Sequence, residues 1–73
     1  MLLIDAVEKA LNKVRKKIEE KFNNDYPYAV VSLKWVKNDL DLKRRSGIDF
    51  LIRKLKEDYR VGKDGNWLIV EEE

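Results

Sequence analysis

The strongest constraint on the fold is an apolar stripe near the N-terminus that recurs every three or four residues. Its members share one face of a helix of roughly five turns: Ile4, Val7, Leu11, Val14, Ile18 and Phe22. Asn23-Asn24-Asp25 and the following Pro27 end this helix. Because the helix takes a large part of a chain of only 73 residues, we expect one domain, residues 1–73, whose remaining residues form a layer that covers the stripe.

The composition is that of a folded protein, and it excludes several kinds of chemistry. Hydrophobic residues make up 44% and charged residues 41% of the chain, which is unlike a disordered sequence. Cys and His are both absent, so disulfides, thiolate metal sites and the commonest general base are excluded. We therefore expect a protein that is not an enzyme and that needs no cofactor, metal or small-molecule substrate.

No segment of the sequence predicts attachment to a membrane. No apolar run approaches the roughly 18 residues of a membrane span. Met1-Leu2-Leu3-Ile4 is followed at once by Asp5, which is unlike the core of a signal peptide. On these grounds we expect a cytoplasmic protein without a membrane partner.

A second pattern, between residues 28 and 43, predicts a β-hairpin. Within the run 28–36, Val31, Leu33 and Trp35 alternate with Ser32 and Lys34, and the alternation resumes at 40–43 after Asn38-Asp39. Such alternation in a run rich in β-branched and aromatic residues is typical of a half-buried strand. With Asn38-Asp39 as a two-residue turn, one face of the hairpin is expected to carry Val31, Leu33, Trp35, Leu40 and Leu42.

A second helix and a second hairpin are predicted for the rest of the chain. Ser46 is expected to cap the helix, with Asp49 as its partner in a capping box. The β-rich runs 59–62 and 67–70 flank Asp64-Gly65, which is a strong hairpin signal. This order of elements predicts an α+β two-layer sandwich: two helices on a four-stranded antiparallel sheet, in the manner of a permuted ferredoxin-like fold.

An alternative interpretation replaces the first hairpin with a short helix. Ser32 is then the cap of that helix, and the next helix begins near Lys43. Together with a hairpin at residues 63–66, this pattern resembles a winged helix over about half of the chain. One residue departs from the resemblance, because Lys37 stands where such motifs usually bury a small side chain.

The candidate binding residues form a basic cluster at the start of the second predicted helix. Lys43, Arg44 and Arg45 are three consecutive basic residues, with Arg53 and Lys63 as supports. In a winged helix this end enters the major groove, where Arg can bond guanine edges; in the sandwich it meets phosphates only.

The charge balance keeps nucleic acid open as a partner. The chain has 16 basic and 14 acidic residues, a net charge of +2, and three of the acids are the final Glu71-Glu72-Glu73. The body is therefore more basic than the whole chain. We predict a small non-enzymatic nucleic-acid-binding protein that contacts the phosphate backbone of DNA or RNA.

Other functions also fit the sequence. The absence of Gln, Thr, His and Cys is typical of a thermostable protein or of a designed scaffold whose charged surface serves solubility. A protein-interaction module would use the first helix or an open sheet face. Asp39, Asp41 and Lys43 resemble the acid-x-Lys pattern of nucleases, although exposed hairpin charges explain them without chemistry. Trp35 and Trp67 are predicted to pack in the core.

Overall fold

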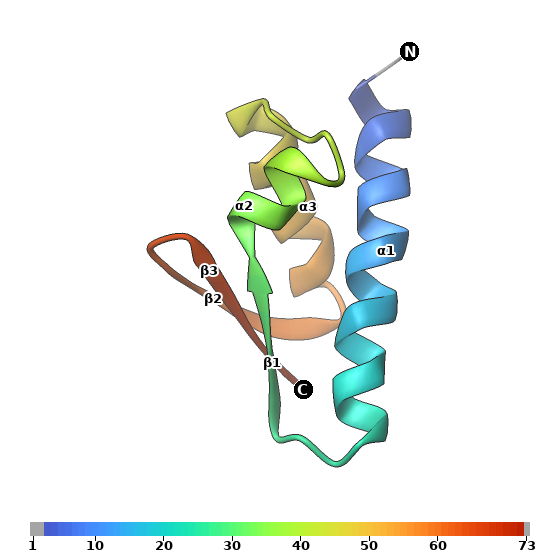
Figure 1. The fold of residues 1–73 in the computed structure, drawn as a ribbon, viewed down its shortest axis with the longest axis vertical. Helices are drawn as coiled ribbons and strands as arrows, with labels where there is room; N and C mark the ends of the chain where they lie inside the picture. Colours follow the sequence, from blue (N-terminus) through green and yellow to red (C-terminus); the bar gives the residue numbers. More distant parts are fainter. Residues whose placement is uncertain (1–2, 73) are drawn as a thin grey trace.

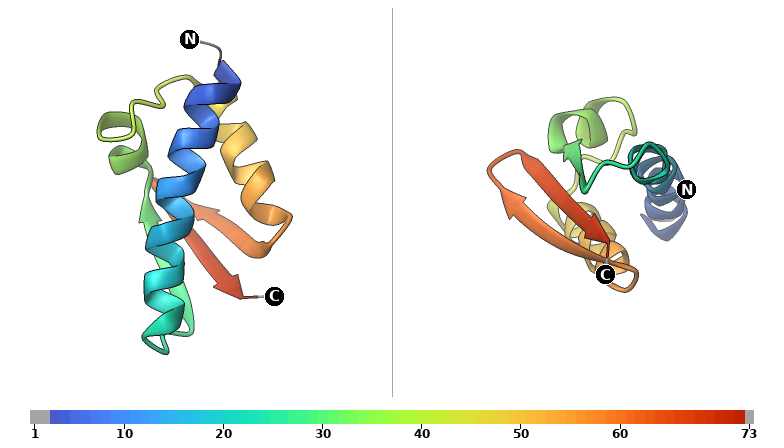
Figure 2. Two further views of the ribbon diagram at one scale, coloured as in Figure 1. Left: turned by 90° about the vertical axis from the view of Figure 1, so that its right-hand side faces the viewer. Right: turned by 90° about the horizontal axis from the view of Figure 1, so that it is seen from below.

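The computed structural model describes residues 3–72 as a small α+β domain (Figure 1). Three helices and a three-stranded antiparallel sheet follow one another along the chain: α1 (Leu3–Asn23), β1 (Tyr28–Ser32), α2 (Leu33–Asn38), α3 (Arg45–Lys56), β2 (Tyr59–Asp64) and β3 (Trp67–Glu72). The strand order is β1-β3-β2, which makes β3 the central strand, as predicted. Figure 2 shows α1 running beside both α3 and β1, so the core lies between these helices and one face of the sheet.

The first helix forms as its apolar stripe predicts. Val7, Val14 and Ile18 are fully buried, and Leu11 and Phe22 pack partly buried at the edge of the core. The predicted contribution of the Ile4 side chain lies outside the described part of the chain. The helix ends at Asn23 and is followed by a turn that contains a left-handed residue, Asp25 (φ 64°). The amides of Asp25 and Tyr26 donate back to the carbonyls of Phe22 and Lys21, both at 3.1 Å, which satisfies the last turn.

The predicted first hairpin and the four-stranded sheet are wrong, because residues 33–38 form helix α2. The Trp35 amide donates to the Ser32 hydroxyl at 3.4 Å, so Ser32 caps this helix. Leu33 and Val36 are buried one turn apart, whereas Trp35 is only half-buried. Over so few residues, an alternating pattern and a helical spacing fit the same sequence. The capping hydroxyl and the burial of Val36 favour the helix.

The second predicted helix exists but begins before the predicted cap. Helix α3 starts at Arg45, with Arg44 in the cap position, and Ser46 lies exposed in the first turn. The predicted capping box of Ser46 and Asp49 is therefore wrong. The short helix after Ser32 and a helix starting near Lys43 are the elements that the alternative interpretation predicts.

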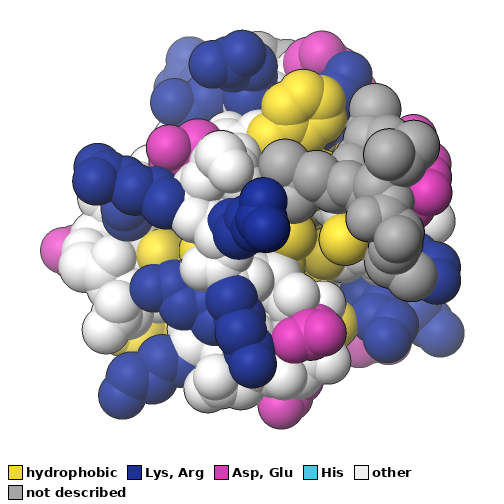
Figure 3. Space-filling model, turned by 90° about the horizontal axis from the view of Figure 1, so that it is seen from above, with side chains coloured by type: hydrophobic (Ala, Val, Ile, Leu, Met, Phe, Trp, Pro, Cys, Tyr) yellow, Lys and Arg dark blue, Asp and Glu magenta, His cyan; other side chains and the backbone are white. Residues whose placement is uncertain are grey.

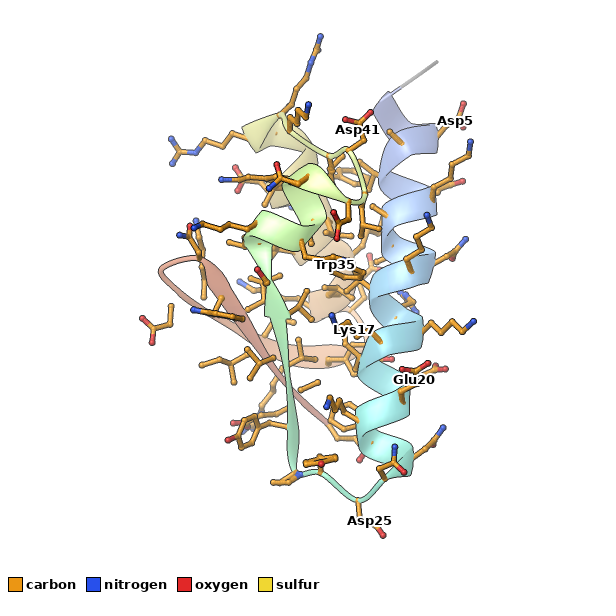
Figure 4. The ribbon with its side chains drawn as sticks, viewed as in Figure 1. Asp5, Lys17, Glu20, Asp25, Trp35 and Asp41 are labelled. Atoms are coloured by element: carbon orange, nitrogen blue, oxygen red, sulfur yellow. The ribbon has the colours of Figure 1, made fainter. Side chains whose placement is uncertain are left out.

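The hairpin β2–β3 is confirmed. Asp64 pairs with Trp67, and Gly65 between them has φ 60°, as the first of the two central residues of a type II′ turn requires. The Trp67 side chain is 52% exposed, so its predicted place in the core is wrong. It lies on the outer face of the sheet, opposite the face on which the buried Leu68 and Val70 meet the helices. Trp35, at the edge of the core, lies beneath the Lys17 ammonium, 4.2 Å from the ring centre (Figure 4).

The two serines provide a test of these helix starts. Replacing Ser32 with Ala removes the hydroxyl that accepts from Trp35, and we expect a loss of about 1 kcal/mol in the free energy of unfolding. Replacing Ser46 with Ala, inside the first turn of α3, is expected to be neutral or slightly stabilising, because Ala is the better helix former. Urea denaturation of both variants measures the difference. A larger loss at Ser46 than at Ser32 would contradict the observed boundaries.

Tyr59 gives the stability of the domain a component that depends on pH. Burial raises the pKa of its phenol, Glu19 adds to the rise, and Arg15, which pairs with Asp58, acts against it. A phenol whose pKa is higher in the folded than in the unfolded protein makes its full contribution to stability below the unfolded pKa, which is about 10. That contribution is lost as the pH rises through the pKa of the folded state. Above about pH 10 we therefore expect the wild type to lose more stability than Tyr59→Phe. Parallel curves of unfolding free energy against pH would refute this effect.

Candidate nucleic-acid interface

A hollow of about 220 Å³ opens where α2, the start of α3 and the hairpin β2–β3 meet. Its lining includes four basic side chains from four segments: Lys37 in α2, Lys43 in the following loop, Arg45 in α3 and Lys63 in β2. Leu33 and Ile48 supply apolar wall, and Asp49 is the one acid. Figure 3 looks down on the end of the molecule at which α3 begins, and Lys and Arg side chains spread over much of it. Residues far apart in the sequence thus form one basic surface.

The loop between α2 and α3 places one of these side chains, Lys43. Asp41 turns the backbone with a left-handed φ of 56°. Leu42, the next residue, is buried at 2% exposure, and its amide donates to the Val36 carbonyl at 3.2 Å. Since Leu42 anchors the loop in the core, the adjacent Lys43 lies at the surface, close to the first turn of α3. Leu42 is therefore buried, as the hairpin interpretation predicts, but it lies in a loop and not in a strand.

The hairpin is fixed against α2 by a backbone hydrogen bond. The amide of Leu33, the first residue of α2, donates to the carbonyl of Asn66 in the hairpin turn, at 2.7 Å. This bond joins the start of α2 to the turn that follows Lys63 and Asp64. As a result, Lys63 is held on the same hollow as Lys37, although 25 positions separate them in the sequence.

The lining cations are mostly free of acidic partners. Within residues 3–72, Lys43 is the only one in an ion pair, with Asp41 at 3.7 Å. Both side chains are more than 70% exposed, and such a pair contributes little to stability. The first turn of α3 adds the partial positive charge of a helix N-terminus to the same surface. The hollow therefore presents a positive field to solvent, moderated by Asp49.

Helix α3 extends this surface beyond the hollow. Its buried side carries Gly47, Ile48, Leu51 and Leu55, which pack into the core. The opposite side is exposed and places Arg45, Asp49 and Arg53 one turn apart from each other. Lys56 follows Arg53 by three positions and is also exposed. One side of α3 is thus free to contact a partner, and it is rich in hydrogen-bonding groups.

Three of the five predicted site residues meet at the hollow. Lys43, Arg45 and Lys63 line it, whereas Arg44 occupies the cap position of α3 and Arg53 lies exposed two turns along that helix. Lys37 belongs to the same hollow and was missed, because the predicted hairpin placed it beside a turn. The cap at Ser32 is the sequence signal that finds it, since a helix from Leu33 brings Lys37 to the end of α2.

The other candidate chemistry has no support in the geometry. Asp39 and Asp41 are exposed loop residues, and no three His, Cys, Asp or Glu side chains within residues 3–72 come together in a way that could hold a metal ion. Over the same residues, no helix is both long and apolar enough to cross a membrane.

Comparisons with protein-family models, with curated proteins and with solved structures give no match for this chain.

Proposed function

We propose that this domain is a winged helix that binds nucleic acid through the hollow and the exposed side of α3. The order of the elements supports the fold: a long helix, a strand, two further helices and a terminal hairpin. The observation that carries the function is the convergence of Lys37, Lys43, Arg45 and Lys63 at one hollow. Charged residues that only keep a protein soluble can be spread over its whole surface. Binding to a phosphate backbone, in contrast, uses several cations on one surface.

In this proposal the hollow and α3 have different tasks. Lys37, Lys43 and Lys63, the lysines of the hollow, each donate charge-assisted hydrogen bonds to a backbone phosphate. These contacts set the orientation of the domain on the duplex. Arg45 and Arg53, on the exposed side of α3, then face the base edges in the groove, where an Arg can bond guanine. Asp49 between them suits a cytosine amino group, the donor that an acidic side chain accepts from.

The shape of the surface favours duplex DNA over duplex RNA. An α-helix with its side chains is about 10–12 Å across, and the major groove of B-form DNA is about 12 Å wide. The major groove of A-form RNA is too deep and narrow to admit side chains in this way. Since α3 carries the proposed base contacts, we assign B-form DNA as the ligand.

The test is a titration of a fluorescent DNA duplex with the wild-type protein at two salt concentrations. If Lys37, Lys43 and Lys63 each contact a phosphate, binding must weaken by roughly 40-fold between 50 and 200 mM salt. An RNA duplex of the same sequence, titrated alongside, is expected to bind more weakly. Absence of binding at 50 mM salt would reject the proposal and leave the solubility of an idealised scaffold as the reason for the charged surface.

A further inference from the structure

The strand β1 lies at one edge of the sheet and differs from every other element in carrying no charge. Its sequence, Tyr28-Ala29-Val30-Val31-Ser32, stands in a chain that is 41% charged. The strand at the other edge, β2, carries Arg60, Lys63 and Asp64. Charged side chains on an edge strand hinder pairing with other strands. One edge of this sheet is therefore protected against pairing, and the other is open.

Exposed apolar side chains concentrate at the same edge. Within residues 5–72, whose side-chain exposure is described, the exposed large hydrophobic side chains are Tyr26 at 54%, Tyr28 at 52%, Val30 at 37% and Trp67 at 52%. Three of these four lie in β1 or two residues before it. In Figure 1, β1 runs in the foreground with no other element in front of it. The open edge thus carries most of the large apolar side chains that are exposed within residues 5–72.

The hydrogen bonds to β3 determine which backbone groups of β1 face outward. The Leu33 amide donates to Asn66, and this pair continues the register in which Val31 faces Leu68 and Ala29 faces Val70. Because bonding groups alternate along an antiparallel strand, Ala29, Val31 and Leu33 direct theirs to β3. Tyr28, Val30 and Ser32 consequently direct their amides and carbonyls away from the sheet.

We propose that a second copy of this chain pairs with β1, antiparallel and with a two-fold axis at Val30. Val30 then faces Val30 of the second copy, and Tyr28 faces Ser32. The outward amides of Tyr28, Val30 and Ser32 and the outward carbonyls of Tyr28 and Val30 find partners in this register, while the carbonyl of Ser32, as the cap of α2, already serves that helix. No like charges meet within the strand, because it has none. Helix α1 carries both Lys17 and Glu20 on the turns shown beside β1 in Figure 4. This part of α1 therefore carries charges of both signs.

The second copy fits this edge better than an unrelated strand does, because the pairing leaves no open edge. The two sheets join into one, and the outermost strands are then the two copies of β2, whose charges protect them. The pairing also has a geometric consequence. Since α2 follows directly from the C-terminal end of β1, antiparallel strands place the two basic hollows at opposite ends of the dimer.

The test is the mass of the protein in solution without nucleic acid, measured by sedimentation over a range of concentrations. Val30→Lys places two ammonium groups opposite each other on the two-fold axis, and we expect it to weaken the dimer by about tenfold or more. Gly62→Lys is the matched control. Val30 and Gly62 both pair with Ile69, from opposite sides of β3, and a side chain at Gly62 meets nothing within 4 Å.

Two outcomes would overturn the dimer. One is a wild-type protein that stays monomeric up to about 1 mM, where even a weak pair should form. The other is an equal effect of Val30→Lys and Gly62→Lys, which would indicate net charge and not the edge. Amide hydrogen exchange of the wild type tests the register without a variant. The amides of Tyr28, Val30 and Ser32 should gain protection with concentration, whereas those of Ala29 and Val31 should be protected throughout.

Discussion

Replacing Leu51 with Ala is expected to lower the free energy of unfolding by about 3 kcal/mol. Leu51 is completely buried in α3, which packs against both α1 and the hairpin. The loss combines the transfer of the missing carbon atoms with the cavity that remains, and close packing on both sides limits how far the cavity can collapse. A domain of 73 residues has a total stability of about 4–11 kcal/mol, so this change removes a large fraction of it.

The neighbouring Ile52 provides the control for this prediction. It lies on the same helix and loses carbon atoms in the same way, but it is only half-buried at the edge of the core. Ile52→Ala should therefore cost about 1 kcal/mol, in proportion to the smaller area removed from water. Urea denaturation gives both values. Equal losses at Leu51 and Ile52 would mean that the inner side of α3 has been assigned wrongly.

The largest functional effect is expected when three lining cations are removed together. Lys37, Lys43 and Lys63 come from three different segments, and all three are exposed, so their replacement by Ala leaves the core intact. If each contacts a phosphate, the slope of log K against log salt should fall by about 0.9 per contact, or about 2.7 in all. With none of these three phosphate contacts left, affinity should then change little between 50 and 200 mM salt.

A triple replacement of Lys9, Lys13 and Lys16 on α1 is the matched control. These lysines are also exposed, and their loss changes the net charge by the same amount. They lie away from the hollow, so the slope should stay close to that of the wild type. The salt dependence of duplex binding is measured for both variants. If the two triples behave alike, the attraction comes from net charge, and the hollow is not a binding site.

Those parts of the fold with long or distinctive local patterns follow from the sequence. The stripe of α1 repeats over five turns, so only a helix accommodates it, and Asp64-Gly65 supplies the turn conformation of the hairpin. Residues 33–38 are too few to show a repeated pattern of this kind. Leu33 and Val36 satisfy a helical spacing, while Leu33 and Trp35 satisfy alternation, and the Ser32 cap and the tertiary burial of Val36 decide between them.

The candidate site could be predicted only in part, for a related reason. Lys43, Arg45 and Lys63 stand out as local clusters of charge or as turn residues, and these need no tertiary information. Lys37 joins them only once α2 is helical and the hairpin is bonded to it. The exposure of Trp67 has a similar origin. An aromatic residue in an apolar strand suggests burial, but the described elements cover only one face of the sheet.

The hydrogen bond from Leu33 to Asn66 has a consequence for the speed and the entropic cost of the proposed DNA binding. A hairpin tip is ordinarily mobile, and a ligand that uses it must first restrict that motion at the expense of conformational entropy. Here the tip is already tied to α2 when the chain has folded, so Lys63 needs little further ordering. Association should then depend on diffusion and on the attraction between opposite charges, without a slow search for the correct arrangement.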